Sequence, residues 1–330
     1  MGHGMKLRRY AASDAAPWNQ FIQDSKNGTF LFQRSYMDYH ADRFPDHSLI
    51  AISDGGMWMA VLPACEKADV LSTHAGLTYG GWVTDSAMTC PHMMHLFDQM
   101  LIYLALQGFA SVRYKSIPHI YHRLPAQEDL YALFRHDAVI DRRDTLSVLD
   151  LRAMPLTQER RRRGAKKAVQ RLVEIRLEQN SPQNYADFWR CLEFNLHAQF
   201  GEKPTHSLLE IQKLHSLHPE HIRLHVACLG NELCAGVVVY LCEPVCHVQY
   251  ISATPAGKQA AALDLLFMKL TSYYQQQESY WYLDFGISNE LDGRYLNLGL
   301  IEHKEGFGAR TVVHDFYQLK IPTTTTGVSS

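Results

Sequence analysis

The sequence predicts an α/β (α+β) chain built from two tandem units, each a mixed, mostly antiparallel sheet flanked by helices. Its 330 residues fit roughly two domains of about 150 residues each. Both halves predict the same order of elements: two helices, three strands, a helix, a strand, a helix and a strand. When one half is slid over the other by about 175 residues, Leu49 falls on Leu224, Gly55 on Gly230 and Ala60 on Ala235.

The first half carries clear cap and turn signals. Ser13 and Asp14 can cap the first helix, and Ser53-Asp54-Gly55-Gly56 is typical of a hairpin turn. The predicted elements are helices over 15–24 and 35–44, strands over 48–53 and 57–65, an irregular glycine-rich stretch over 76–81, a helix from 91 to about 107, a strand over 109–115, a helix over 128–134 and a strand over 144–151.

The second half repeats this pattern. Ser181-Pro182 is a cap followed by a proline at the first helical position, and Ser207 with Glu210 has the spacing of a capping box. The predicted elements are helices from 182 to about 198 and after 207, strands over 221–229, 233–241 and 245–252, a loop over 254–259, a helix to about 276, a strand over 280–285, a short helix near 290, a strand at Gly299-Leu300-Ile301 and a strand over 310–319.

A basic segment lies between the halves. Six of the eight residues from 160 to 167 are Arg or Lys. The segment 153–180 is predicted to be a linker helix, because apolar residues recur at helical spacing within it. Either this helix is a solvated linker, or it binds phosphates, since arginine side chains match phosphate oxygens.

Composition excludes several classes of protein. Hydrophobic residues make up 46% and charged residues 20% of the chain, which rules out wholesale disorder. The net charge of −2 gives no general basic field for DNA, so any contact with nucleic acid must be local. Seven cysteines without a CxxC pair, and histidines without an HExxH motif, predict free thiols and no metal site. The basic, weakly apolar start and the lack of a long apolar run predict a cytoplasmic protein without a transmembrane segment.

Several segments resemble one known family. They are 159–168, Gln249-Tyr250-Ile251-Ser252, 283–288 and 300–308 in the second half, with Tyr36-Met37-Asp38-Tyr39-His40 and 74–81 in the first. These resemble the FemAB-like branch of the GNAT acyltransferase superfamily, of the acetyltransferase domain 6 type. The resemblance implies a degenerate GNAT-like domain over 1–152 and a catalytic GNAT-like domain over 181–320, followed by a disordered tail over 321–330. In such a domain two central strands part and admit the pantetheine arm of the donor.

The resemblance also implies an activity. A primary amine attacks an activated acyl group directly, with acyl-CoA (acetyl-CoA) as co-substrate and no metal. The acceptor is expected to be a small molecule, such as a nucleotide-linked amino sugar of bacterial cell-envelope polysaccharide synthesis. One alternative is an aminoacyl-tRNA-dependent transferase acting on a peptidoglycan precursor, and another is a non-catalytic binding module. The oligomeric state is left open.

Three residues are the catalytic candidates. Lys304, expected after the Gly-Leu-Ile strand, is similar to a lysine of Fem-type enzymes that stabilises charge during acyl transfer. Asp284 lies in an apolar strand, where a carboxylate is costly unless it is paired or faces a cleft, so it could serve as general base or bind the ammonium. His247 could also be acid or base. The structural alternatives are a surface lysine, a carboxylate bonded to backbone N–H groups, and a core histidine.

The binding candidates come from three segments. Gly257, Lys258, Gln259 and Ala260 occupy the position of the GNAT pyrophosphate loop, although only one glycine remains there. Strand alternation predicts that Gln249 shares the face of His247 and that Tyr250 takes the other. The substrate-binding candidates are Arg161, Arg162, Lys166, Asn195, Gln249 and Tyr250. Gly306 and Gly308 are expected to adopt positive φ.

Overall fold

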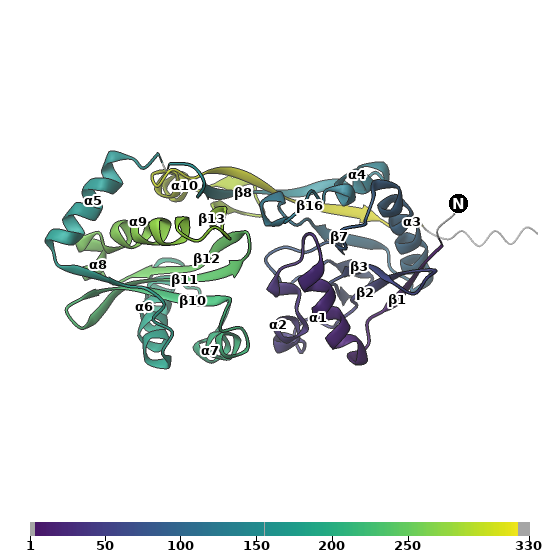
Figure 1. The fold of residues 1–330 in the computed structure, drawn as a ribbon, viewed down its shortest axis with the longest axis horizontal. Helices are drawn as coiled ribbons and strands as arrows, with labels where there is room; N and C mark the ends of the chain where they lie inside the picture. Colours follow the sequence, from purple (N-terminus) through teal and green to yellow (C-terminus); the bar gives the residue numbers. More distant parts are fainter. Residues whose placement is uncertain (1–3, 155, 323–330) are drawn as a thin grey trace, which may run out of the picture. The chain divides into compact units, whose positions relative to one another are not determined.

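The structure is a computed structural model that describes residues 4–154 and 156–322. The chain forms two compact units: unit 1 comprises Met1–Asp144 with Val313–Ser330, and unit 2 comprises Thr145–Val312. The chain therefore leaves unit 1 once and returns to it at its end, as the colours of Figure 1 trace. Of the predicted tail, 323–330 lies outside the described residues, whereas Ile321 is buried.

Unit 1 packs its strands around one long helix. Its elements are β1 (Met5–Arg9), α1 (Ala15–Asp24), α2 (Arg34–Met37), β2 (Leu49–Ser53), β3 (Trp58–Leu62), β4 (Cys65–Lys67), β5 (Val70–Ser72), β6 (Val83–Thr84), α3 (Cys90–Leu106), β7 (Ser111–Lys115), α4 (Glu128–Arg135) and the end of β16 (Arg310–Lys320). The strands lie in the orders β1-β2-β3-β6 and β4-β5-β7-β16. From α3, Leu96, Phe97 and Met100 pack in one apolar cluster with residues of β2, β3 and β7.

The helix predicted over 35–44 is much shorter in the structure. Helix α2 ends at Met37, and the chain continues as a 3₁₀ turn over Asp38–His40. The buried ring of His40 bonds through Nδ1 to the carbonyl of Met37 at 2.7 Å. That carbonyl is the acceptor that a further α-helical turn would use, so the side chain competes with continuation of the helix.

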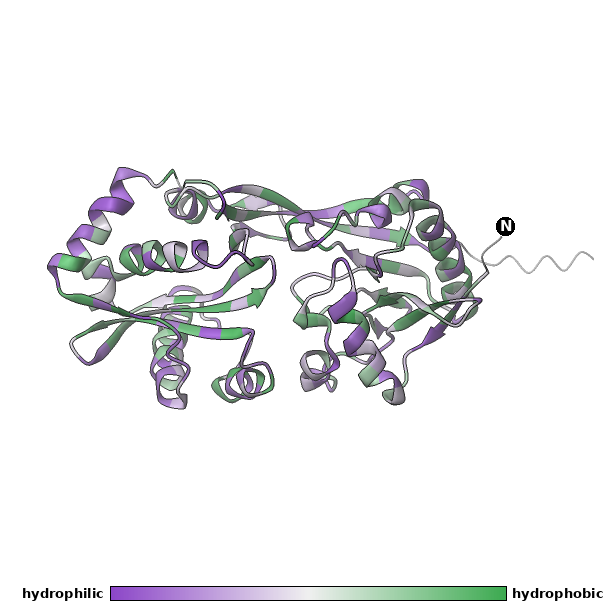
Figure 2. Cartoon of the chain, in the orientation of Figure 1, coloured by the Kyte–Doolittle hydropathy of each residue, from purple (hydrophilic) through white to green (hydrophobic). Residues whose placement is uncertain are grey.

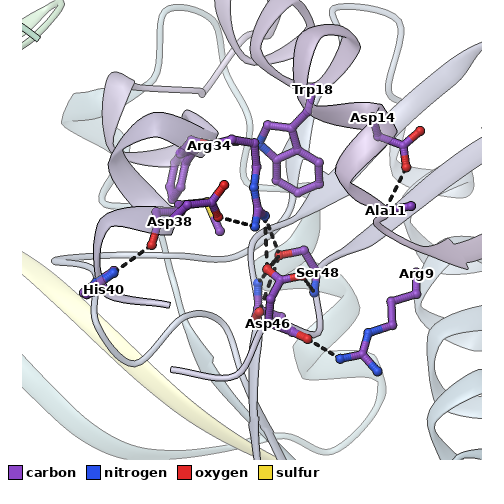
Figure 3. A network of polar contacts seen from close by, with 12 residues as sticks. Arg9, Ala11, Asp14, Trp18, Arg34, Asp38, His40, Asp46 and Ser48 are labelled. Atoms are coloured by element: carbon purple, nitrogen blue, oxygen red, sulfur yellow. Dashed lines mark hydrogen bonds and ion pairs between the residues drawn. The ribbon is translucent and has the colours of Figure 1, made fainter. Parts of the chain in front are cut away.

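A buried arginine ties this region together (Figure 3). Arg34 donates to Asp46 at 3.0 Å, to Asp38 at 2.6 Å and to Ser48 at 3.3 Å. Its guanidinium also lies 3.9 Å from the ring centroid of Tyr10. A buried arginine is tolerated because its two terminal nitrogens donate to carboxylates and a hydroxyl, although Nε has no hydrogen-bond partner among the residues that the structure describes.

Unit 2 is a mixed sheet with helices on both faces. Its elements are the end of β8 (Val139–Asp150), α5 (Glu159–Gln170), β9 (Val173–Arg176), α6 (Pro182–Phe200), α7 (Leu208–Leu217), β10 (Ile222–Leu229), β11 (Glu232–Cys242), β12 (Val245–Ala253), α8 (Pro255–Ala260), α9 (Ala262–Gln275), β13 (Tyr282–Ile287), β14 (Asn289–Glu290), β15 (Tyr295–Leu296) and α10 (Leu298–Glu305). The main strands follow the order β8-β13-β12-β11-β10-β9, and of these pairs only β12 with β13 is parallel.

Helices α9 and α6 cover opposite faces of this sheet (Figure 1). Phe267 of α9 packs with Val237 of β11 and with Val248 of β12. On the other face, a Cβ added at Gly236 would come within 2.4 Å of Phe188 of α6, so the glycine permits close helix packing. Strand alternation thus divides β11 and β12 between a face toward α9 and a face toward α6.

The basic helix packs inside unit 2. Helix α5 begins at Glu159, and its Ala165 and Ala168 share a cluster with Ala262 and Leu265 of α9. It is therefore an element of the second unit, whereas we expected a linker between domains.

Three local predictions in unit 2 are wrong. The segment predicted as a loop over 254–259 is mostly helix α8, because Thr254 caps it and Pro255 opens its first turn. The predicted helix near 290 is the β14–β15 hairpin. The predicted strand at 299–301 belongs to α10, whose cap Asn297 accepts a hydrogen bond from the N–H of Leu300 at 3.0 Å.

Candidate active site

Strands β12 and β13 run together for three residue pairs and then part. The pairs are Val245 with Tyr282, Cys246 with Leu283, and His247 with Asp284. Beyond His247, β12 continues to Ala253 in pairing with β11. His247 and Asp284 thus form the last pair before the strands separate.

These two residues also bond through their side chains. Nδ1 of His247 lies 2.9 Å from Oδ2 of Asp284, and both side chains are buried. The other carboxylate oxygen of Asp284 accepts the N–H of Gly286 at 2.7 Å. A carboxylate that accepts from Nδ1–H leaves the lone pair of a neutral imidazole on Nε2, which is the arrangement of an oriented base.

Lys304 reaches the same turn from α10. Its Nζ donates to the carbonyl of Gly286 at 3.0 Å and to that of Ile287 at 2.5 Å. Burial lowers the pKa of Lys304 to about 8, although the negative charge of Asp284 raises it. Lys304 is therefore no surface lysine: it is buried, and it joins α10 to the end of β13. The three catalytic candidates of the sequence meet at this turn.

A β-bulge changes the faces predicted for β12. Val239 pairs with Val248 and Val238 pairs with Tyr250, so Gln249 is an extra residue. The bulge restarts the alternation, and Tyr250 comes to the α6 face, where its ring lies 5.0 Å from that of Trp189. The sequence predicts that Tyr250 lies on the face opposite that of His247, and the bulge makes this prediction wrong. Burial raises the pKa of Tyr250 to about 12.

The hydroxyl of Tyr250 is held by His206. Nδ1 of His206 lies 2.5 Å from Tyr250 Oη, and the backbone N–H of His206 donates to that oxygen at 3.2 Å. Nothing local in the sequence predicts this contact, because residues 206 and 250 are 44 positions apart.

The predicted pyrophosphate residues lie in α8 and form no glycine-rich loop. The N–H of Gly257 is taken by the hydroxyl of Thr254 at 3.1 Å. A Cβ at Gly257 would lie 2.0 Å from the carbonyl oxygen of Cys234, so the glycine is required for packing against β11. Lys258 and Gln259 are exposed, and Ala260 is buried.

Asn195 joins α6 to the end of β12. Its side-chain amide donates to Ser252 at 2.7 Å and to the carbonyl of Ala253 at 2.9 Å, and it accepts from Lys258 at 2.9 Å. Ala253 and His247 are six residues apart on β12, which is roughly 20 Å along an extended strand. Asn195 and Lys258 therefore form a second cluster, away from the turn that holds the catalytic candidates. A pocket of about 510 Å³ adjoins it, lined by Asp187, Arg190, Cys191, Phe194, Asn231, Glu232, Leu233, Thr254 and Pro255.

Arg161 is placed differently from our expectation. It is buried, donates to Asp264 of α9 at 2.8 Å and lies over the ring of Phe307 at 5.2 Å. Because Arg161 is already paired with Asp264, the hypothesis that α5 binds phosphates depends on the exposed Arg162 and Lys166. Gly306 has a φ of −59°, not a positive value, and a Cβ there would lie 2.9 Å from Nε of Arg161.

Within 4–154 and 156–322, no group of three or more His, Cys, Asp or Glu side chains is arranged to hold a metal ion. Among the helices that the structure describes, none is long and apolar enough to cross a membrane.

Residues 157–304 match the family described as acetyltransferase (GNAT) domain. The chain carries a GNAT-family acyltransferase domain. This match confirms the predicted family type, and the mixed sheet flanked by helices confirms the predicted fold class. No curated protein sequence matches the chain.

Solved structures with this fold extend over nearly the whole chain. FemX is 10% identical with a TM-score of 0.67, covering 96% of this chain and 98% of that one. L-PGS from Bacillus licheniformis is 12% identical with a TM-score of 0.58, covering 96% and 93%. A tandem GNAT protein from the clavulanic acid biosynthesis pathway is 12% identical with a TM-score of 0.54, covering 97% and 99%. At these identities the likeness establishes the fold, which agrees with the FemAB-like resemblance.

Proposed function

We propose that the chain is an N-acyltransferase that moves an acyl group from acyl-CoA to a primary amine. The acceptor would be a small molecule, such as a nucleotide-linked amino sugar of cell-surface polysaccharide synthesis. One observation carries the proposal: the hydrogen-bonded pair of His247 and Asp284 is buried where β12 and β13 part. In GNAT domains the acyl donor enters between such strands, so this pair would face the reacting thioester.

In this proposal His247 and Asp284 handle the proton. His247 accepts a proton from the acceptor ammonium through Nε2, and Asp284 stabilises the resulting imidazolium through Nδ1. The free amine then attacks the thioester carbonyl, so that a C–N bond forms. The C–S bond breaks next, and the leaving thiolate takes up the second proton that the nitrogen releases.

Lys304 would stabilise the charge that develops on the carbonyl oxygen. An ammonium group has three N–H donors, and the carbonyls of Gly286 and Ile287 take two of them. The third can serve the oxyanion, which exists only near the transition state. A pKa of about 8 keeps most of the population charged at neutral pH.

The donor phosphates would depend on side chains. The backbone N–H of Gly257 is occupied, so the exposed Lys258 and Gln259 are the groups of α8 that can meet an anion. Arg162 and Lys166 remain candidates for substrate phosphates. We expect donor binding in unit 2 alone, because the catalytic pair and α8 both belong to it.

A second candidate function is aminoacyl-tRNA-dependent transfer to a peptidoglycan precursor. The occupied N–H of Gly257 weakens the case for CoA, and the exposed basic residues of α5 carry the charge that contact with a tRNA would require. The likeness in fold to FemX is in keeping with this candidate.

Ligand-induced stabilisation distinguishes the donors. A ligand at about 100 times its Kd adds about 2.7 kcal/mol to the free energy of unfolding. We expect acetyl-CoA and CoA to raise the Tm, and uncharged tRNA to leave it unchanged. Stabilisation by aminoacyl-tRNA alone would establish the second candidate. A chain that responds to no donor would be the non-catalytic binding module.

Thiol release with a panel of amino sugars then tests the chemistry. We expect His247→Asn to lower turnover by about 10²–10⁴, the usual contribution of a positioned base. His119→Asn, an exposed histidine of unit 1, is the matched control and should keep full turnover. Equal turnover in both variants would remove His247 from the mechanism.

A further inference from the structure

We propose that α5 and the turn after it form a docking surface for an anionic lipid bilayer. This inference goes beyond the proposed function and concerns where the enzyme works. The docking surface consists of the exposed basic residues of α5, with Val169 and Leu172 beside them.

The outer side of α5 carries an unusual density of positive charge. Its inner side, with Arg161, Ala165 and Ala168, is buried against the rest of unit 2. The exposed basic residues of the helix and its C-cap are Arg160, Arg162, Arg163, Lys166, Lys167 and Arg171. The helix contains one acidic residue, Glu159, at its start. In Figure 2 most of this helix is drawn in the hydrophilic colour.

Apolar side chains stand among these charges. Val169 is 58% exposed and Leu172 is 82% exposed. At 100° per residue, Arg162, Lys166 and Val169 fall within roughly 60° of one another around the helix. Leu172 has a φ of 60°, a left-handed conformation that disfavours a leucine. The chain thus holds a large apolar side chain in solvent at a strained turn, although glycine or asparagine would suit that backbone better.

An apolar groove begins at the same place. It has a volume of about 450 Å³ and lies between α5, β9 and α9, with Val169, Val173, Ile175, Leu177 and Leu265 as its apolar lining. Lys269 lines the groove and is exposed, which places one cation beside its apolar side chains. An apolar lining next to exposed cations matches a lipid, whose acyl chains are joined to an anionic headgroup.

The mixture of residues favours a bilayer over a nucleic acid. Single-stranded nucleic acids are held by basic residues together with aromatic rings on which bases stack, and α5 contains no aromatic residue. Peripheral proteins bind anionic membranes through Lys and Arg on one side of a helix and aliphatic side chains beside them.

Vesicle sedimentation with the full chain tests the proposal. We expect binding to phosphatidylcholine vesicles that contain phosphatidylglycerol, and weak binding to phosphatidylcholine alone. Arg163→Gln with Lys167→Gln should weaken binding by about 30-fold, because each basic residue at an anionic surface contributes about fivefold. The matched control is Lys203→Gln with Lys213→Gln, two exposed lysines outside the docking surface, which should change little.

Leu172→Asn separates a bilayer from a polyanion. Asparagine accepts the left-handed backbone, so this variant should fold at least as well as the wild type. We expect it to bind the anionic vesicles about tenfold more weakly, because it loses one buried aliphatic side chain. Its affinity for tRNA should not change. The proposal would be overturned if Leu172→Asn bound vesicles as well as the wild type, or if the wild type did not bind anionic vesicles. Binding of tRNA without binding of vesicles would assign the surface to nucleic acid.

Discussion

Each unit of the molecule contains a lysine that is bound to two backbone carbonyls. In unit 1, Lys115 at the end of β7 donates to the carbonyl of His74, just before the glycine-rich stretch, and to that of Leu77 within it. In unit 2, Lys304 donates to those of Gly286 and Ile287. Burial lowers the pKa of each lysine to about 8. A lysine bonded to two backbone carbonyls thus stabilises a turn in each unit.

The histidines around the two lysines differ. In unit 1, His74 packs on His40 with ring centroids 5.4 Å apart, and burial lowers the pKa of His74 to about 3. Nδ1 of His40 bonds to a backbone carbonyl. In unit 2, His247 bonds to a carboxylate. Burial opposes a positive charge on His74, whereas a positive charge on His247 would be balanced by the carboxylate of Asp284. Of the described histidines beside these two lysines, His247 is thus the one that bonds to a carboxylate; in unit 1 such a pair is formed by His47 and Glu66.

The largest expected effect comes from Asp284→Asn. The amide can still accept the N–H of Gly286, but it cannot stabilise an imidazolium at His247. We expect turnover in the thiol-release assay to fall by about 10³-fold, with donor affinity close to that of the wild type. His74→Asn in unit 1 is the comparison variant and should leave turnover unchanged. An equal loss in both variants would mean that the two units share the chemistry.

The next effect compares the two lysines. Lys304→Met should lower turnover by about 10²–10³ through the lost charge at the oxyanion, whereas Lys115→Met should leave turnover intact. Both variants leave two carbonyls without their donor, so both should lower the free energy of unfolding by about 2 kcal/mol. Turnover and chemical unfolding, measured on the same preparations, check both parts. If Lys304→Met lost only stability, Lys304 would be a structural lysine like Lys115.

A smaller effect is expected in the pH dependence of stability. The ordinary pKa of lysine is 10.5, and that of folded Lys304 is about 8. Between these values the unfolded chain binds more protons than the folded one, so this lysine makes stability rise with pH across the window. The full effect of Lys304 is at most about 3 kcal/mol. Between pH 8 and pH 10, urea unfolding should show a smaller increase in the free energy of unfolding for Lys304→Met than for the wild type. Parallel pH profiles would contradict the lowered pKa.

Local signals predicted much of the fold, and contacts distant in sequence account for most of the rest. The cap at Ser181 and the capping box of Ser207 with Glu210 are both present in the structure, because such signals act within one helical turn. Asn297 is an equally local cap signal, although we predict a strand after it. By contrast, the pairing of Arg161 with Asp264 joins residues that are 103 positions apart, and no local sequence pattern predicts it.

The candidate site shows the same division. Asp284 and His247 could be chosen because polar residues in apolar strands need a reason, and the parallel pairing of β12 with β13 brings them together. The face of Tyr250 could not be predicted, because a one-residue bulge at Gln249 leaves no mark in the pattern of apolar residues.

The smallest effect concerns the exposed basic residues of unit 2. Arg162 and Lys166 face solvent, so their contribution to binding a substrate phosphate is screened by salt. We expect Arg162→Gln with Lys166→Gln to raise the KM of the phosphate-bearing substrate by about fivefold at low salt, and to flatten its salt dependence. Lys67→Gln with Arg135→Gln removes two exposed charges from unit 1 and should change neither quantity.

Arg161→Gln should act differently from both double variants. It leaves Asp264 buried without its partner, so it should lower the Tm, while the salt dependence of KM should persist. If KM and its salt dependence were the same in all of these variants, the basic side of α5 would have no role in substrate binding.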